Sequence, residues 1–344
     1  MNRLLDKLQI EVPIIQAGMA GGITTPELVA TVANEGALGT IGAGYMDGTS
    51  LKEDIRKVKQ LTDQPFAVNL FAVNMDASSA DIQPMQRFLD GFRNELGADP
   101  GASSVHVYDH LDQKINVILE ENIPIVSTAF GMLGDAHMER LQNKGVTLIG
   151  MATNPAEARQ LEDAGYDVIV AQGVEAGGHR GTFNVENFPY GSTIGLLVLV
   201  QEIVAQVRVP VVAAGGIHSK SQMDALLAMG AAGVQLGTRF LVAKEAGTNT
   251  AYRQALISAD TGDTAITKVF SGRPARAIRN RFVQEVETSE IEPLPYPIQN
   301  QMTKDIRAAA KQHSLADMQS LWAGQGVGLI EQEEPAAVIV RSFV

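Results

Sequence analysis

A single histidine stands in a loop that is crowded with glycine. His179 lies within residues 172–181 (QGVEAGGHRG), which follow the apolar run at 168–171. Imidazole titrates near neutral pH and can act as a general acid, a base or a hydrogen-bond partner. Glycine lets the backbone approach a flat ligand closely. We therefore predict that His179 is catalytic; the alternative is a flexible turn that happens to expose a histidine and an arginine.

Several other short segments combine glycine with amides or hydroxyls where an apolar run ends. We predict that residues of these segments and of the histidine loop bind a cofactor. The candidates are Ala17, Gly18, Met19, Asn69, Gln172, Gly177, Gly178, Gly215, Gly216, Gln235, Leu236, Gly237 and Thr238. Glycine-rich loops bind phosphate through backbone N–H groups. The loops at 214–217 and 235–239 thus predict a phosphorylated cofactor, although each glycine could instead serve only a turn.

These segments follow eight runs rich in Val, Ile and Ala that predict strands, at residues 13–16, 38–42, 66–70, 124–128, 146–151, 167–172, 209–213 and 233–237. Helical segments lie between them, at 25–35, 50–61, 111–121, 135–143, 154–164, 194–205 and 219–229, and several begin with a capping Ser, Thr, Asn or Asp. Strands without polar alternation are typical of a parallel sheet covered by helices. Eight such units predict an α/β fold, the (β/α)8 TIM barrel, whose active site lies at the carboxyl ends of the strands.

Two stretches do not fit this repeat. An insertion after the third strand, residues 72–108, predicts a helix at 82–96 and could form a lid. The stretch 244–344 follows the eighth strand and predicts helices at 249–259, 304–311 and 315–323. We expect a barrel over 1–243 and a C-terminal helical extension over 244–344 that packs at the barrel mouth.

Composition excludes several classes of function. The chain of 344 residues has 39 acidic and 27 basic side chains, a net charge of −12 and no basic run, which disfavours a nucleic-acid partner. It has no cysteine, which excludes disulfides and thiolate chemistry and fits a reducing compartment. The charged N-terminus does not resemble a signal peptide, and no apolar run reaches the roughly 18 residues of a membrane span. We expect a cytoplasmic protein without a membrane partner.

Two other motifs are weaker evidence for a functional site. Residues 42–48 (GAGYMDG) have G-x-G-x-x-x-G spacing, which differs from the dinucleotide fingerprint. His106 and His110 are four residues apart near Asp109 and Asp112, but they lack the glutamate of a metalloprotease motif. We therefore predict no metal site.

Several segments of the chain together resemble those of a known protein family. The segments 16–19 (QAGM), 65–70 (PFAVNL), 172–181, 214–217 (AGGI) and 235–240 (QLGTRF) together are similar to those of the nitronate monooxygenases, formerly called 2-nitropropane dioxygenases. The resemblance runs over most of the chain. Residues 293–297 (PLPYP), with Asn300, Thr303, Lys304 and Arg307, and residues 321–325 (LWAGQ) are similar to the bacterial class I group.

The resemblance implies a noncovalent FMN at the barrel mouth, with its phosphate on Gly216 and residues 235–238 and its ring near Gly18, Met19, Asn69, Gln172 and Gly177. It implies oxidation of a nitronate, such as propionate 3-nitronate, by O2 to a carbonyl compound and nitrite. His179 would orient the nitro group or act as base toward a neutral nitroalkane. As a further hypothesis, Lys304 and Tyr296, with Tyr108 from the insertion, bind the anionic substrate. Family members tend to have a second tyrosine where this chain has Asn300, so its substrate range is open.

Two alternatives remain open from the sequence. FMN-dependent enoyl-acyl-carrier-protein reductases and quinone reductases share the histidine loop and the barrel, so a reductase that uses NAD(P)H is the first. The second is a flavin-free barrel that binds a sugar phosphate through the loops at Gly215 and Gly237. A dehydrogenase of the IMP type is disfavoured because its covalent step needs a cysteine.

Overall fold

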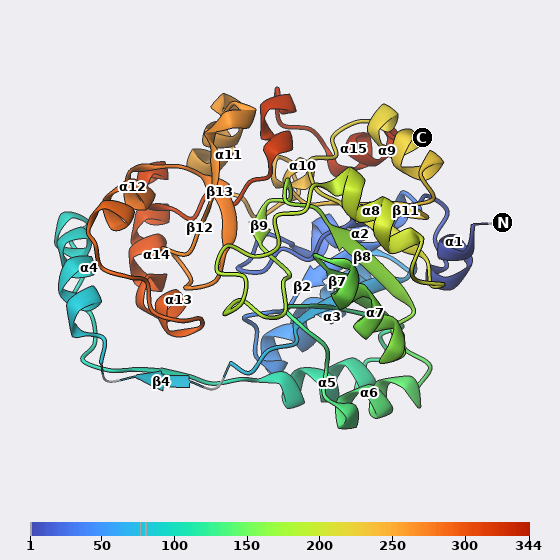
Figure 1. Cartoon of the computed structure of the whole chain (residues 1–344), viewed down its shortest axis with the longest axis horizontal. Coiled ribbons are helices and arrows are strands. Elements are labelled where there is room, and N and C mark those ends of the chain that lie inside the picture. Colours follow the sequence, from blue (N-terminus) through green and yellow to red (C-terminus); the bar gives the residue numbers. More distant parts are fainter. Residues whose placement is uncertain (1, 76, 80) are drawn as a thin grey trace.

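A ring of eight parallel strands forms the centre of the computed structural model, which describes residues 2–75, 77–79 and 81–344 (Figure 1). The strands are β1 (Ile14–Gln16), β2 (Gly39–Gly42), β3 (Phe66–Phe71), β6 (Ile125–Ala129), β7 (Thr147–Ala152), β8 (Val168–Gln172), β10 (Val211–Ala214) and β11 (Gly233–Leu236). Their order is β1-β11-β10-β8-β7-β6-β3-β2, and a parallel bridge from Ile15 to Leu38 closes the ring. The predicted TIM barrel is confirmed, and each strand overlaps a predicted one.

Helices between the strands cover the outside of the ring. They are α2 (Pro26–Asn34), α3 (Gly48–Leu61), α5 (Leu111–Glu120), α6 (Asp135–Gln142), α7 (Pro155–Asp163), α8 (Leu196–Val204) and α9 (Lys220–Ala228), and the short α10 (Thr238–Leu241) follows β11. Local sequence sets several of their starts, because the side chains of Thr25, Asn154 and Ser219 accept backbone N–H groups of the first turn. These helices agree with the predicted segments to within a few residues.

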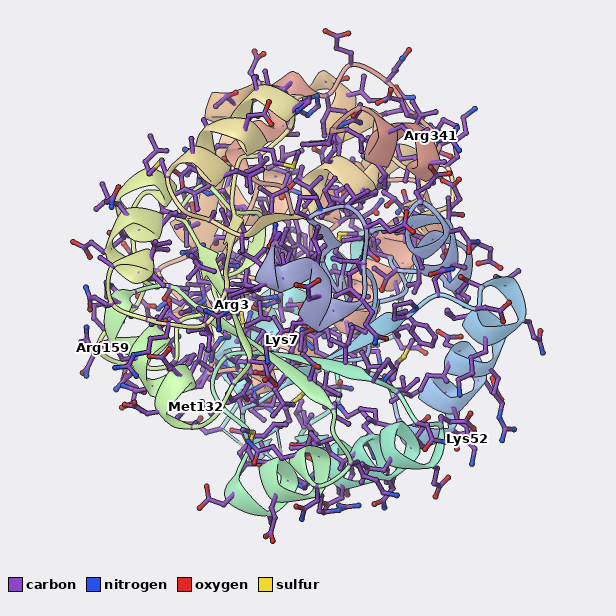
Figure 2. The ribbon with its side chains drawn as sticks, turned by 90° about the vertical axis from the view of Figure 1, so that its right-hand side faces the viewer. Arg3, Lys7, Lys52, Met132, Arg159 and Arg341 are labelled. Carbon is purple, nitrogen blue, oxygen red and sulfur yellow. The ribbon has the colours of Figure 1, made fainter. Side chains whose placement is uncertain are left out.

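One end of the barrel is closed by the N-terminal helix α1 (Arg3–Leu8). Its Leu4 and Leu8 are buried in one cluster with inward-facing strand residues such as Ile15, Ile125 and Val168. Figure 2 shows α1, with Arg3 and Lys7, in front of the strands at this end. A ligand therefore has access to the barrel from the opposite end, where the strands terminate.

The insertion and the C-terminal extension pack on each other. The insertion contains β4 (Ala77–Ser79), α4 (Gln83–Glu95) and β5 (Val105–Val107). The extension contains α11 (Thr250–Ser258), η1 (Thr261–Asp263), β12 (Thr264–Thr267), β13 (Ala275–Ile278), α12 (Arg281–Thr288), α13 (Ile298–Met302), α14 (Lys304–Gln312), η2 (Ala316–Met318), η3 (Gln325–Leu329) and α15 (Ala336–Arg341). Leu89 and Phe92 of α4 share a buried cluster with Phe282 of α12 and Ile306 of α14, and Figure 1 shows these helices together at one side of the barrel.

The extension differs from the prediction in two respects. The predicted helix at 315–323 is wrong: only η2 is helical, and the chain after it is irregular, because Asn280 donates to the carbonyls of Ala316 and Gln319 and Trp322 bridges Ala277. The antiparallel strands β12 and β13 were not predicted. No helix in the described part of the chain is both long and apolar enough to cross a membrane.

Candidate active site

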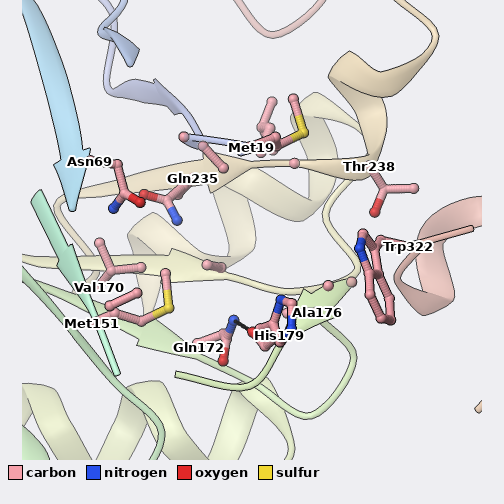
Figure 3. A pocket seen from close by; sticks show the side chains of 18 of the residues that line it. Met19, Asn69, Met151, Val170, Gln172, Ala176, His179, Gln235, Thr238 and Trp322 are labelled. Atoms are coloured by element: carbon pink, nitrogen blue, oxygen red, sulfur yellow. Dashed lines mark hydrogen bonds between the residues drawn. The ribbon is translucent and has the colours of Figure 1, made fainter. Parts of the chain in front are cut away.

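A cavity of about 200 Å3 opens at the carboxyl ends of the barrel strands. All the residues predicted to bind the cofactor line it, although they come from five strands and the loops that follow them. Figure 3 shows the side chains of Asn69, Gln172, Gln235 and His179 around this cavity. Its lining also includes apolar barrel residues such as Met151 and Val170. The structure thus gathers the dispersed sequence segments into one site.

His179 is held in this cavity by an element that the sequence did not reveal. The two-residue strand β9 (Gly178–His179) pairs with β13 of the extension, with His179 opposite Ala275. The imidazole Nε2 lies 2.8 Å from the Ser271 hydroxyl, which in turn lies 3.1 Å from the Arg273 carbonyl. Because that hydroxyl donates to the carbonyl, Nε2 is the protonated nitrogen and Nδ1 carries the lone pair. In the described chain Nδ1 has no protein partner.

The surroundings keep this imidazole neutral. Burial, followed by the positive charges of Arg273 and Arg307, lowers the pKa of His179 from 6.5 to about 3. The Arg273 guanidinium lies 4.1 Å from the centre of the Phe130 ring and donates to the Thr182 carbonyl. Neither arginine has an ion-pair partner among the described residues. The site therefore combines a neutral imidazole with two nearby cations that form no direct ion pair, which suits an anionic ligand.

This pKa predicts how stability depends on pH. Between pH 6.5 and about 3 the unfolded chain protonates His179 and the folded protein does not, so the free energy of unfolding falls as pH is lowered through this window. His179→Asn removes this contribution. Urea unfolding midpoints measured at pH 7.5 and 4.5 should differ less in His179→Asn than in the wild type. His313→Asn, which changes an exposed histidine, should keep the wild-type difference; equal differences in all three proteins would contradict the prediction.

Neighbouring residues of the histidine loop have structural roles. The Gln172 side chain donates to the His179 carbonyl (3.1 Å) and accepts from the Gly181 N–H (2.8 Å), so it fixes the loop while lining the cavity. Arg180 is fully buried and donates to the carbonyls of Gly173 and Gln172. Arg180 is thus neither the exposed arginine of the flexible-turn alternative nor a ligand contact.

Three aromatic rings from different parts of the chain lie close to the His179 ring. Its ring centre lies 5.1 Å from that of Trp322, 5.6 Å from Phe130 and 6.2 Å from Tyr296. Burial raises the pKa of Tyr296, whose hydroxyl donates to the Met75 sulfur (3.7 Å). Tyr296, which we predicted to bind substrate, thus lies beside the candidate catalytic residue.

The other two predicted substrate residues lie in a second cavity of about 490 Å3. Tyr108 and Lys304 line it, and Tyr108 is largely exposed. The two cavities share His179 and Trp322 among their lining residues. The structure therefore places the proposed substrate groups next to the first cavity, on the side of the insertion and the extension.

The glycines of residues 42–48, the candidate dinucleotide motif, differ in their surroundings from the glycines predicted to bind the cofactor. A Cβ atom at Gly42 or Gly44 would clash with the Met19 backbone or the Phe71 ring, so these glycines allow close packing and leave no room for a dinucleotide. A Cβ atom at Gly237 would meet only the Ala17 Cβ, at 3.8 Å, and one at Gly178 would meet nothing within 4 Å. The latter two line the first cavity and leave space for a ligand.

Sequence reasoning missed several residues of the site. Tyr45, Phe130, Ser271 and Arg273 carried no local signal, because their roles depend on which segments the fold brings to His179. His106 and His110 do not share a helix face: His106 is in β5, and His110 precedes α5. Both line the second cavity, and no group of three His, Asp or Glu in the described chain could hold a metal ion.

Comparisons with known proteins agree with this architecture. The family model described as "Nitronate monooxygenase" matches residues 2–344. A protein of Staphylococcus haemolyticus named probable nitronate monooxygenase is 41% identical over 325 residues, covering 94% of this chain and 91% of its own. The solved structure of a nitroalkane oxidase from Streptomyces ansochromogenes has a TM-score of 0.91 and 37% identity, covering 98% and 96% of the two chains. FabK from Thermotoga maritima has a TM-score of 0.78 and 29% identity, covering 100% and 94%.

Proposed function

Because this chain belongs to the nitronate monooxygenase family and is a flavin-type oxidoreductase, we propose that it binds FMN and oxidises alkyl nitronates, such as propionate 3-nitronate, with O2 to a carbonyl compound and nitrite. The observation that carries this proposal is a neutral His179 that lines a glycine-rich cavity and has two arginines near it, neither of which forms an ion pair in the described chain. Such a site favours a substrate that is already an anion. Membership of this family disfavours the alternative of a flavin-free barrel that binds a sugar phosphate.

The first cavity has the features that an FMN needs. Gly216 and Gly237 would hold the phosphate with Thr238, since the backbone there is free of side chains and the Gly237 Cβ position faces open space. Asn69 and Gln235 would bind the polar edge of the ring. The Asn69 amide donates to Ser127, whereas the Gln235 amide has no protein partner in the described chain. When bound, FMN supplies the electron acceptor and the site of reaction with O2.

The arginines would bind the anionic substrate, and His179 would accept a proton. The positive charge of Arg273 would stabilise the negative charge of the nitronate near the imidazole, and Arg307, which lines the second cavity, would add a smaller attraction. The Nδ1 lone pair of His179 is available to receive the α-proton of a neutral nitroalkane, but a pKa of about 3 makes it a weak base in the ligand-free site. We therefore expect nitronates to be better substrates than the corresponding neutral nitroalkanes.

One experiment separates this function from that of an NAD(P)H-dependent reductase, the first alternative that the sequence leaves open. The purified protein, loaded with FMN, is mixed anaerobically with propionate 3-nitronate or with NADH. We expect the nitronate to bleach the flavin absorbance rapidly and NADH to do so at least about 100-fold more slowly, a difference of roughly 3 kcal/mol in barrier. Rapid reduction by NADH and none by nitronate would overturn the proposal.

Lys304 offers a smaller test of substrate recognition. Replacing it with methionine should raise KM for propionate 3-nitronate about fivefold or less, because an ion pair of an exposed lysine contributes roughly 1 kcal/mol or less. KM for ethyl nitronate, which has no carboxylate, should stay the same. Lys144→Met removes an exposed charge outside both cavities and serves as the control. An unchanged KM for the carboxylated substrate in Lys304→Met would refute this role.

A further inference from the structure

The second cavity is larger than a small nitronate requires. At about 490 Å3 it exceeds the first cavity, and the two cavities are adjacent because both are lined by Tyr45, His179 and Trp322. A substrate whose reacting end lies at His179 can therefore extend into it. The lining of the second cavity then indicates what the far end of the substrate carries.

That lining is strongly positive in a protein of net charge −12. It includes one carboxylate, Asp109, and four cations: Lys114, Lys304, Arg307 and Lys311. The last three are spaced i, i+3 and i+7 in α14, so they share one face of the helix over about 10 Å. A local concentration of positive charge against an acidic background points to an anionic ligand group.

Arg307 is the cation that is best oriented for such a group. Its Nε donates to the Thr303 carbonyl (3.2 Å), and its Nη2 donates to the carbonyl (2.8 Å) and the side-chain oxygen (3.0 Å) of Asn300. These bonds fix the plane of the guanidinium. In the described chain Nη1 has no protein partner, and no carboxylate forms an ion pair with Arg307. Both N–H groups on Nη1 of this pre-positioned cation therefore remain for a ligand.

Lys114 provides a second, independent observation. Its side chain is 2% exposed and lines the cavity from α5, where its Nζ lies 3.3 Å from the Gly44 carbonyl. Asp109 lies near enough to raise the pKa of Lys114, but burial lowers it by more. A buried ammonium group is costly unless opposite charge offsets its burial, and Asp109 offsets only part of that cost for Lys114. An anionic ligand in the second cavity would supply further negative charge.

We propose that the second cavity is a subsite for a remote anionic group, a carboxylate or a phosphate ester, at the far end of a nitronate longer than three carbons, with Arg307 as the specificity-determining residue. This inference rests on the proposed function for the identity of the reacting end. It goes further in predicting that affinity increases when a long substrate carries a terminal charge.

Steady-state kinetics with substrates of matched length test the subsite. The nitronates of 6-nitrohexanoate, 6-nitrohexyl phosphate and 1-nitrohexane are compared in the FMN-loaded protein by nitrite release. We expect KM to be about tenfold or more lower for at least one charged substrate than for 1-nitrohexane, and the two charged substrates distinguish carboxylate from phosphate. Arg307→Met should remove most of the difference, Arg307→Lys should retain more of it, and Lys144→Met should leave it unchanged. Equal KM values for all three substrates in the wild type would overturn the proposal.

A binding measurement keeps this test independent of turnover. Calorimetric titration of the FMN-loaded protein with suberate and with octanoate compares an unreactive dianion and monoanion of equal length. We expect suberate to bind at least about tenfold more tightly, and Arg307→Met to remove that advantage. If no nitronate is oxidised but suberate is preferred, the proposed function fails and the anionic subsite stands. If nitronates are oxidised and suberate has no advantage, the subsite fails alone.

Discussion

Replacing Gly237 with valine is expected to give a folded, colourless protein that does not retain FMN. The Gly237 Cβ position lies in the first cavity with only the Ala17 Cβ within 4 Å, and its φ of −110° is outside the left-handed region that favours glycine. The added side chain would therefore occupy the proposed phosphate position with little effect on packing. Loss of two or more charge-assisted hydrogen bonds predicts a Kd for FMN at least about 100-fold higher.

The measurements for this variant separate binding from folding. The flavin-to-protein absorbance ratio and a fluorescence titration with FMN report the affinity. Thermal unfolding must be compared between apoproteins, because a bound cofactor stabilises the folded state by itself. Gly134→Val is the matched control, since a Cβ there meets nothing within 4 Å and Gly134 lies outside both cavities. Normal FMN content in Gly237→Val would show that the phosphate lies elsewhere.

His179→Asn should separate two classes of substrate. For neutral nitroethane we expect kcat/KM to fall by about 100-fold or more, because removing a positioned proton acceptor typically costs 10²–10⁴ in rate. For ethyl nitronate, which has already lost its proton, only orientation is affected, and we expect a loss of about tenfold. Parallel assays of nitrite release at pH 8 with both substrates measure the two ratios.

The control for this comparison is His313→Asn, which should match the wild type with both substrates because His313 is exposed and lies outside both cavities. Equal losses for the two substrates in His179→Asn would mean that His179 does not act as a base. No loss with either would remove His179 from the mechanism. Each outcome bears on the role of the imidazole and leaves the FMN site as a separate question.

Much of the barrel could be predicted because its signals are local. Apolar strand runs, capping residues such as Thr25 and Ser219, and glycines after the strands each act within a few residues of their own position. The fold then brings strand ends together by a general rule, so Asn69 and Gly216 could be assigned to one site before any contact was known. The extension was predicted less well, because its irregular chain at 315–323 depends on bonds from Asn280, far away in sequence.

The sequence by itself determined that this chain forms a (β/α)8 barrel with a glycine-lined rim and that His179 lies in the loop at that rim, because burial, turn and capping preferences are encoded locally. Only the tertiary structure decided the chemistry of His179. Pairing of β9 with β13, the Ser271 hydrogen bond and the charges of Arg273 and Arg307 all come from segments about 90 or more residues away. Electrostatic surroundings depend on distance in space, and a linear sequence does not specify that distance.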